Sequence, residues 1–152
     1  MLKGIFAISG QQGLFKMVAE SKNNIIVESL ETKKRIPTYS SSKVSALEDI
    51  AIYTETGDIP LKEIFKAIYD KEEGALAISH KSSGNELKNY FEEIAPDFDK
   101  DRVYVSDIKK VMLWYNILHE KEMLDFSDIE EKEDEKEGGE DVETTENDAV
   151  VN

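Results

Sequence analysis

Residues 14–30 read LFKMVAESKNNIIVESL, and this stretch decides the fold of the N-terminal half. Phe15, Met17 and Ala19 lie on one face of the segment, and Lys16 and Glu20 lie on the other. Such alternation predicts a β-strand. The next four residues, SKNN, predict a hairpin turn because asparagine tolerates the left-handed backbone that such turns need. A second apolar run follows from residue 25, so the stretch predicts an antiparallel hairpin.

Short strands are also predicted on both sides of this hairpin. Residues 5–8 (IFAI) form an apolar run, and the sequence Gly10-Gln11-Gln12-Gly13 that follows predicts a tight turn. Residues 31–34 turn the chain into a fourth strand over 35–39. Pro37 has no N–H to donate to a ladder, so the fourth strand is predicted to lie at an edge of the sheet.

The segment 44–49 (VSALED) is too short for a full helix and predicts a single helical turn, after which residues 50–54 (IAIYT) return to β-character. Five short strands with a helical turn before the last one are the layout of an SH3-like small β-barrel. We therefore predict such a barrel over residues 1–56. A domain of about 56 residues is marginally stable alone, so we expect the rest of the chain to pack against it.

Residues 57–122 carry three helical patterns, each with apolar residues at the spacing i, i+3, i+4, i+7. The stripes are Leu61, Ile64, Phe65 and Ile68; Leu87, Tyr90, Phe91 and Ile94; and Ile108, Val111, Met112, Tyr115 and Leu118. The predicted N-caps are Asp58, Ser83 (in a capping box with Glu86) and Ser106. Trp114 and Ile117 widen the third stripe, which predicts neighbours on two sides of that helix.

Together the two halves predict an α+β fold in which an SH3-like small β-barrel packs on a three-helix module. Residues 75–80 (ALAISH), between the first two helices, fit either a strand or a buried connector.

The formal net charge of −14 is concentrated at the C-terminal end, where residues 119–152 hold 15 acidic and 3 basic residues. Residues 123–152 contain too few large apolar side chains to offset the entropy cost of ordering, so we predict a disordered acidic tail. The tail has two interpretations. It keeps copies of the protein apart in solution, or it binds the protein's own basic hairpin or a basic partner.

The composition excludes several classes of protein. The chain has no cysteine, which excludes a disulfide framework, iron–sulfur clusters and thiol chemistry. Its longest apolar run is far shorter than the roughly 18 residues of a membrane span. A secretory signal is not expected either, because only residues 5–8 could form its apolar segment. We therefore expect a cytoplasmic protein with no cofactor and no membrane partner.

Lys33, Lys34 and Arg35 form a basic cluster, with Lys43 nearby and Tyr39 between them. Small barrels bind nucleic acids through basic grooves and stacking aromatic residues, so these five residues are the candidate binding site. The alternative interpretation is a solvated turn beside an edge strand that uses lysine to resist aggregation.

Asp97, Asp99 and Asp101 alternate as carboxylates do at the start of a calcium-binding EF-hand loop. The pattern then fails, because Arg102 stands where the loop needs glycine and Ile108 stands where it needs a bidentate glutamate. We therefore predict no metal site. The three aspartates are the weak candidate for one. Residues 97–101 are interpreted as an acidic interhelical loop whose aspartates pair with Arg102 or with backbone amides.

Three stretches, residues 26–30, 43–54 and 102–111, with Trp114-Tyr115-Asn116 after the last, resemble a family of small Bacteroidota proteins. The resemblance covers residues 1–118. In that family the two halves of the chain are treated as domains of unknown function. The resemblance implies a bacterial cytoplasmic protein with an N-terminal β-module and a C-terminal helical module. It implies no activity and no catalytic residues.

The sequence offers two histidines and no Gly-x-Ser-x-Gly motif, so no catalytic residues are predicted. We expect a non-catalytic protein-interaction (adaptor) module, in which the edge strand 35–39 offers a surface to a protein or peptide partner. The alternative is a nucleic-acid-binding or ribosome-associated protein that binds through the basic hairpin, with Tyr39 as a stacking platform.

Overall fold

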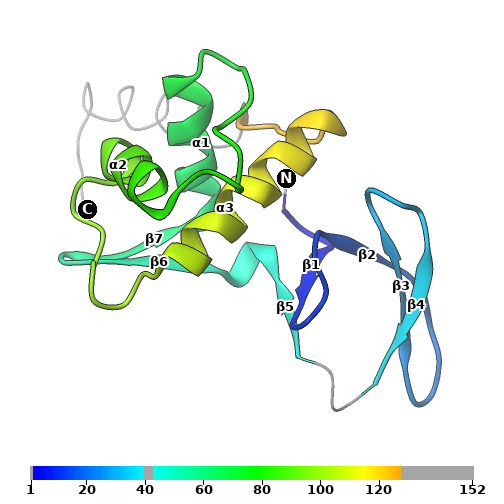
Figure 1. Ribbon diagram of the computed structural model, residues 1–152. Coiled ribbons are helices and arrows are strands. Elements are labelled where there is room, and N and C mark those ends of the chain that lie inside the picture. Colours follow the sequence, from blue (N-terminus) through cyan, green and yellow to red (C-terminus); the bar gives the residue numbers. More distant parts are fainter. Residues whose placement is uncertain (1, 40–42, 128–152) are drawn as a thin grey trace, which may run out of the picture.

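The computed structural model describes residues 2–39 and 43–127, with strands in the N-terminal half and helices in the C-terminal half (Figure 1). The strands are β1 (Ile5–Ile8), β2 (Phe15–Glu20), β3 (Ile25–Ser29), β4 (Arg35–Thr38), β5 (Val44–Ala46), β6 (Ala51–Thr54) and β7 (Gly57–Pro60). A 3-10 turn, η1 (Leu47–Asp49), follows β5, and the helices are α1 (Leu61–Lys71), α2 (Gly84–Ile94) and α3 (Val105–Glu120). This arrangement confirms the predicted α+β class.

The first five strands form one antiparallel sheet in the order β4-β3-β2-β1-β5. The hairpin of residues 14–30 is confirmed, and the Ser21 N–H donates to the Asn24 carbonyl at 2.9 Å to close its turn. Strand β4 lies at an edge, as Pro37 predicted. The two edge strands, β4 and β5, do not pair within the described residues, so the sheet is open and a closed SH3-like barrel is not confirmed.

The fifth strand of the sheet differs from the prediction. Residues 44–46 of the predicted helical turn instead form β5, which pairs with β1, and the helical turn is reduced to η1. Residues 50–54 do supply a strand, β6, but it pairs with β7 in a separate two-stranded sheet. Strand β7 contains Asp58, which was predicted to cap α1, and the helix begins instead after Pro60. A three-residue strand is too short for alternation to show in a sequence.

One side chain of β2 is also placed differently. Between Met17 and Ala19 the register of β2 against β3 shifts, which is a β-bulge. A bulge inserts an extra residue and changes which face the following side chains occupy. Val18 is therefore half-buried and Ala19 is exposed, although the uninterrupted alternation put Ala19 on the apolar face.

Helices α2 and α3 begin with different capping groups. The predicted capping box of α2 is confirmed, because the Ser83 hydroxyl accepts from the Glu86 N–H and the Glu86 carboxylate accepts from the Ser83 N–H. Helix α3 begins one residue before its predicted cap, Ser106. There the Asp107 carboxylate accepts from the Tyr104 N–H at 2.9 Å, which satisfies a donor that the start of a helix leaves free.

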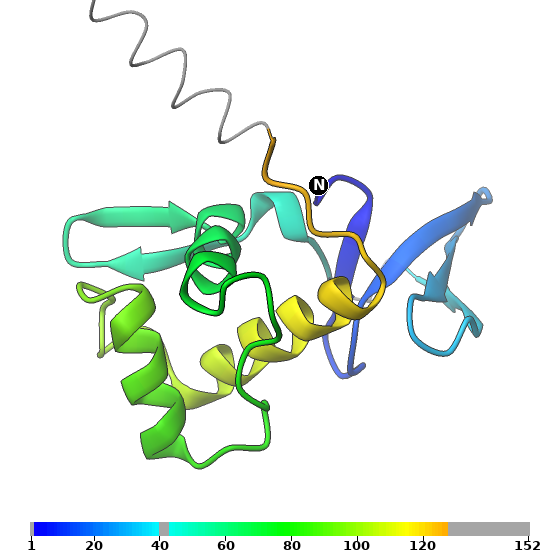
Figure 2. The same ribbon diagram turned by 90° about the horizontal axis from the view of Figure 1, so that it is seen from above.

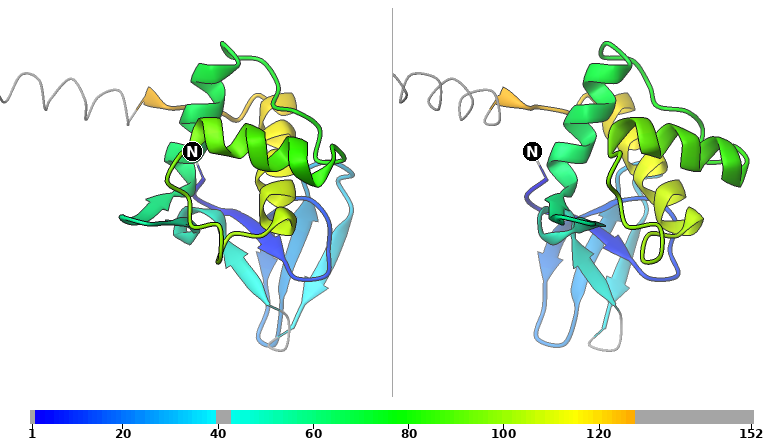
Figure 3. Two further views of the ribbon diagram at one scale, coloured as in Figure 1. Left: turned by 60° about the vertical axis from the view of Figure 1, so that its left-hand side comes forward. Right: turned by 90° about the vertical axis from the view of Figure 1, so that its left-hand side faces the viewer.

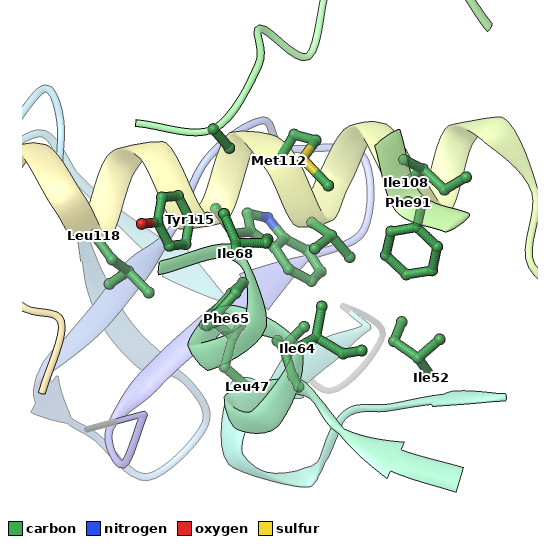
Figure 4. Close-up of a cluster of buried hydrophobic side chains, with 14 of the residues drawn as sticks. Leu47, Ile52, Ile64, Phe65, Ile68, Phe91, Ile108, Met112, Tyr115 and Leu118 are labelled. Carbon is green, nitrogen blue, oxygen red and sulfur yellow. The ribbon is translucent and has the colours of Figure 1, made fainter. Parts of the chain in front are cut away.

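One apolar core joins the sheet to the helices (Figure 4). Residues of α1, including Phe65, face residues of α3, including Tyr115, and their ring centroids lie 6.0 Å apart. The same cluster includes Leu2, Ile5, Leu14 and Leu30 from the N-terminal half. Figure 2 shows α3 running from α2 toward the N-terminal sheet, and in Figure 3 the sheet and the helices adjoin as two bodies. The predicted coverage of α3 on two sides is therefore confirmed.

The ambiguous segment 75–80 is a connector without regular structure, and polar groups of α3 hold it. The Asn116 amide oxygen accepts from the Ala77 N–H at 2.8 Å, and its NH₂ group donates to the Ala77 carbonyl at 3.3 Å. The Tyr115 hydroxyl donates to the Ala75 carbonyl at 2.9 Å. The His119 Nε2 lies 2.7 Å from the Gly74 carbonyl. These contacts replace the ladder bonds that a strand would supply.

The packed region extends beyond the predicted start of the tail at residue 123. Phe126 is buried, and its ring centroid lies 5.2 Å from that of Tyr69 on α1. Residues 123–127 therefore belong to the folded part, and the rest of the predicted disordered tail, 128–152, lies outside the described residues. None of the helices in the described ranges is long and apolar enough to cross a membrane.

Replacing Asn116 with alanine is expected to destabilise the protein, because the Ala77 N–H and the Ala77 and Ile78 carbonyls lose their partner. Unpaired, partly buried backbone groups of this kind cost about 1–3 kcal/mol. Urea unfolding of Asn116→Ala measures the loss in the free energy of unfolding. The control is Asn89→Ala, at an exposed position of α2, which is expected to leave that free energy within about 0.5 kcal/mol. Equal effects of the two substitutions would contradict this account of the connector.

Candidate binding groove along helix α3

A groove lies where the N-terminal sheet meets α3, and we call it the α3 groove. Its larger part has a volume of about 610 Å³ and a smaller part, about 150 Å³, continues along β6. The two parts share four lining residues: Ile50, Asp107, Lys110 and Trp114. One wall is the exposed side of α3, and the other consists of the β1–β2 loop, β5 and β6. The groove is therefore built from both halves of the chain.

The β1–β2 loop reaches the groove because two glycines shape it. Gly10 and Gly13 have φ angles of +85° and +96°, in the region that other residues rarely adopt. A Cβ atom at Gly13 would lie 2.8 Å from the carboxylate of Glu31 and 3.9 Å from the Cδ1 atom of Ile117. The hydrogen-bonded turn lies earlier than predicted, over residues 8–11, where the Gln11 N–H donates to the Ile8 carbonyl at 3.0 Å. The loop that follows passes close to α3.

The lining of the α3 groove combines an apolar floor with cationic groups. Ile50, Leu113 and Trp114 form the apolar part, and Lys43 and Lys110 are exposed at the groove. Within residues 2–39 and 43–127, Asp107 is the one carboxylate of the lining, and it accepts the Tyr104 N–H. A ligand with apolar side chains and a negative charge fits these surroundings.

Arg102 lies at the end of the groove next to β6. Its guanidinium carbon is 4.1 Å from the centroid of the Tyr53 ring, and its Nε donates to the Asp99 carboxylate at 2.8 Å. The hydrogen bond raises the pKa of Arg102 and lowers the pKa of Asp99, so both groups stay charged. Because Arg102 already has an anionic partner, Lys110 and Lys43 are the cations that a ligand meets in this groove.

The structure does not bring the five residues of the predicted basic site together. Lys33 and Lys34 lie in the turn before β4, whereas Tyr39 and Lys43 lie beyond its other end, about 13 Å away for a four-residue strand. Of the five, only Lys43 lines the α3 groove. Tyr39 is exposed, as a stacking residue requires, but the lysines of the turn lie at the far end of the strand.

Arg35 takes part in a row of charges across the sheet. Strand pairing places Glu28 between Lys16 and Arg35, and its carboxylate lies 3.7 Å from Lys16 Nζ and 3.1 Å from Arg35 Nε. The hydrogen bond from Arg35 is the main cause that lowers the pKa of Glu28, and Lys16 contributes. Glu28 therefore offsets part of the positive charge of the predicted basic cluster.

The aspartates of the loop 97–101 have protein partners. Asp97 accepts from the Thr56 hydroxyl at 2.9 Å. Asp99 pairs with Arg102 and also accepts from the Asp101 N–H at 3.0 Å. This is the predicted pairing with Arg102 and backbone amides. Among the residues that the structure describes, no group of three or more His, Cys, Asp or Glu side chains is placed to hold a metal ion.

One face of the five-stranded sheet carries a second apolar cluster, separate from the main core. Ile8, Phe15 and Val27 form a small buried cluster on this face, with Ile36 packed against it. Strand pairing places Met17 opposite Val27 and Val44 opposite Ile8, and these two side chains are 48% and 41% exposed. The openness of the sheet therefore leaves apolar side chains in contact with solvent.

Comparisons with known proteins match both halves of the chain. Residues 2–47 match the family model of a domain of unknown function, DUF5606, and residues 50–118 match a second, DUF6852. A protein from Bacteroides vulgatus, solved by solution NMR in a structural genomics programme, is 46% identical; the match covers 83% of this chain and 91% of that chain, with a TM-score of 0.69. The chain belongs to this two-domain family. The predicted resemblance to a Bacteroidota family is confirmed, and a search of curated proteins finds no match.

The two family models meet between residues 47 and 50, at η1 and the start of β6, so the α3 groove lies at their junction. Sequence patterns could not reveal this groove, because its lining residues come from distant segments that look like ordinary strand, turn and helix positions. Two features of the sequence hinted at the groove: the glycines at positions 10 and 13, and the wide apolar face of α3.

Replacing Glu28 with glutamine is expected to lower the melting temperature at pH 7, because Lys16 and Arg35 lose the carboxylate between them. The pKa of Glu28 is lowered from 4.5 in the folded protein. Its stabilising contribution is therefore present above about pH 4.5 and is lost as the pH falls through the lower, folded value. The difference between the wild type and Glu28→Gln should thus shrink below that pH.

Thermal melts between pH 3 and pH 7 measure this difference, with Glu20→Gln at the exposed end of β2 as the control. A difference that stays constant over this pH range would contradict the role assigned to the Glu28 charge.

Proposed function

We propose that this chain is a cytoplasmic, non-catalytic protein-interaction module that binds a segment of a partner protein in the α3 groove. The observation that carries the proposal is the composition of the groove, an apolar floor of Ile50, Leu113 and Trp114 beside two exposed lysines. Protein interfaces combine an apolar centre with charged groups at the rim in this way. The groove is also bounded by both domains, which supports a function that needs the two of them joined.

The lining of the groove supports binding rather than catalysis. Neither histidine lines it, and its carboxylate, Asp107, is held by a backbone N–H of the α3 cap. A general acid or base needs a titratable side chain that can reach a substrate. Lys110 and Lys43 are exposed, and they attract an anionic segment by their charge.

Strand β4, which the sequence suggested as the partner surface, is less suited to strand addition. In the ladder with β3, Arg35 and Pro37 are the β4 residues whose backbone groups face away from the sheet, and Pro37 has no N–H. We propose that the five-stranded sheet, in which β1 lies between β2 and β5, is an open form of an SH3-like barrel. The α3 groove is the better binding surface.

The nucleic-acid alternative requires the basic hairpin to act as one surface. Against it, Glu28 pairs with Arg35, and Tyr39 and Lys43 lie beyond the opposite end of β4 from Lys33 and Lys34. The charge footprint of nucleic-acid binding is a continuous basic stripe. The protein-interaction proposal is therefore preferred.

Site-specific photo-crosslinking in the native cells tests this proposal. A photoreactive phenylalanine analogue replaces Leu113 in the groove or, in a second variant, Lys34 in the basic hairpin. We expect a defined protein to crosslink at position 113, to persist after nuclease treatment, and to be absent at position 34. Lys110→Glu should reduce the crosslink at position 113 at least about fivefold, because a rim charge that attracts an anionic segment is reversed.

The matched control is Lys109→Glu, which changes charge by the same amount on a side of α3 that does not line the groove. Crosslinks confined to position 34 that vanish with nuclease would replace the proposal with the nucleic-acid alternative. Equal losses from Lys110→Glu and Lys109→Glu would show that net charge, and not the groove, controls binding.

A further inference from the structure

We propose that the partner segment binds as an extended strand along the free edge of β6, with an acidic side chain beside Lys110. This inference rests on the function proposed for the α3 groove and names the binding mode and the chemistry of its ligand. It is carried by unpaired backbone groups of β6 that border the groove.

The pairing of β6 with β7 shows which backbone groups point away from that hairpin. The Leu61 N–H donates to the Ile50 carbonyl at 3.0 Å, and Ile50 stands opposite Leu61 at the end of the ladder. In an antiparallel ladder, hydrogen-bonded and non-hydrogen-bonded pairs alternate. Ile52 therefore bonds to β7, whereas Ala51 and Tyr53 direct their N–H and C=O groups to the other edge of β6.

Part of that outer edge is already used by the chain itself. The Asp99 N–H donates to the Tyr53 carbonyl at 2.9 Å, and the Glu55 N–H donates to the Asp97 carbonyl at 2.9 Å. The chain then leaves the edge, because the Asp99 carbonyl turns to accept the Val103 N–H at the entry to α3. The outer edge of β6 therefore pairs with an antiparallel segment of the same chain, and that segment ends at Asp99.

The remainder of the edge is open. Within the described ranges, no backbone bond beyond the β6–β7 ladder reaches the N–H or C=O of Ala51 or the N–H of Tyr53. Four consecutive residues, 50–53, line the smaller part of the α3 groove. Successive side chains of a strand point to opposite faces, so a cavity that touches all four lies against the backbone edge. A peptide in this cavity would find the N–H and the C=O of Ala51 without partners, whereas Asp99 stands in the pairing position opposite Tyr53.

The charges of the groove select the chemistry of the peptide. Lys110 borders both parts of the groove, and Lys43 borders the larger part. Among the residues that the structure describes, Asp107 is the one acidic residue in the lining, and the two lysines outnumber it. Apolar side chains of the peptide would contact Val111 and Trp114. The ligand is therefore a segment in which an acidic residue stands among apolar ones, bound by strand addition.

One substitution distinguishes backbone pairing of the peptide with β6 from side-chain contacts of the peptide with the groove. Ala51→Pro removes the outward N–H but no bond to β7, and the residue opposite Ala51 is already a proline, Pro60. The residue before a proline must be extended, and Ile50 has φ −84° and ψ 135°. The matched control, Ala51→Val, keeps the N–H and the β-character of the position. Thermal melts of both variants verify that β6 still folds.

The probe is a random dodecapeptide phage library selected on the full chain, followed by synthesis of the enriched peptides. We expect enriched peptides with acidic and apolar residues. Their Kd should rise about tenfold for Ala51→Pro and for Lys110→Glu, and remain within about twofold for Ala51→Val and Lys109→Glu. On peptide binding, amide hydrogen exchange should slow at Ala51, while Ile52, already bonded to β7, should not change.

The other possible results each overturn one named part of the proposal or the whole of it. Peptides that lose affinity for Lys110→Glu but bind Ala51→Pro as well as Ala51→Val would overturn strand addition and keep the groove. Failure to enrich any peptide, or peptides insensitive to both substitutions, would overturn the groove and the strand together. Protection of the Ala51 N–H in the free chain, lost when residues 128–152 are removed, would assign the edge to the chain's own acidic segment instead of a partner.

Discussion

Helix α3 must be covered on more than one side, and the rest of the structure depends on that requirement. Its buried residues, Ile108, Val111, Met112, Trp114, Tyr115, Ile117 and Leu118, are spread too widely around the helix for one neighbour to cover. Helices α1 and α2 cover part of this surface, and the N-terminal half covers another part through Ile5, Leu14 and Leu30 in the same core. A helix of this kind would expose apolar surface if either half were missing.

The groove follows from the same requirement. The sheet contacts α3 at the end where the β1–β2 loop approaches Ile117, and β6 lies near the other end through Val103. Between these contacts the sheet and the helix diverge, which leaves Trp114 at the floor and Lys110 at the rim. Binding capacity in this protein is therefore a property of the junction and not of either domain.

The parts of the fold that the sequence predicts are those that local chemistry determines. The hairpin at residues 21–24, the edge position of Pro37, the capping box at Ser83 and the apolar stripes of the helices each depend on neighbours within a few residues. Strand pairing over long separations is different. Strand β5 pairs with β1 at the start of the chain and is too short to be recognised. The hairpin of β6 with β7 is local, but it was missed because residues 50–54 were assigned to the main sheet.

The candidate site likewise depends on contacts between distant segments of the chain. Proximity in sequence suggested that Lys33, Lys34, Arg35, Tyr39 and Lys43 act together, but an intervening strand separates their two ends and Glu28 pairs with Arg35. In the sequence, Lys110 and Trp114 have the pattern of ordinary positions on an amphipathic helix. They line a groove because the N-terminal sheet lies beside them. The tail was predicted to begin before Phe126, because a single aromatic residue among acidic ones does not show that it packs against Tyr69.

The two domains form one folded unit around α3. Trp114, the sole tryptophan of the chain, lies at the junction and reports on it directly. The most direct measurement is urea unfolding of the full chain, followed in parallel by Trp114 fluorescence and by far-ultraviolet circular dichroism. One coincident transition in both signals is the predicted result. A fluorescence change at lower urea than the loss of circular dichroism would show that the junction opens separately, and it would contradict the account.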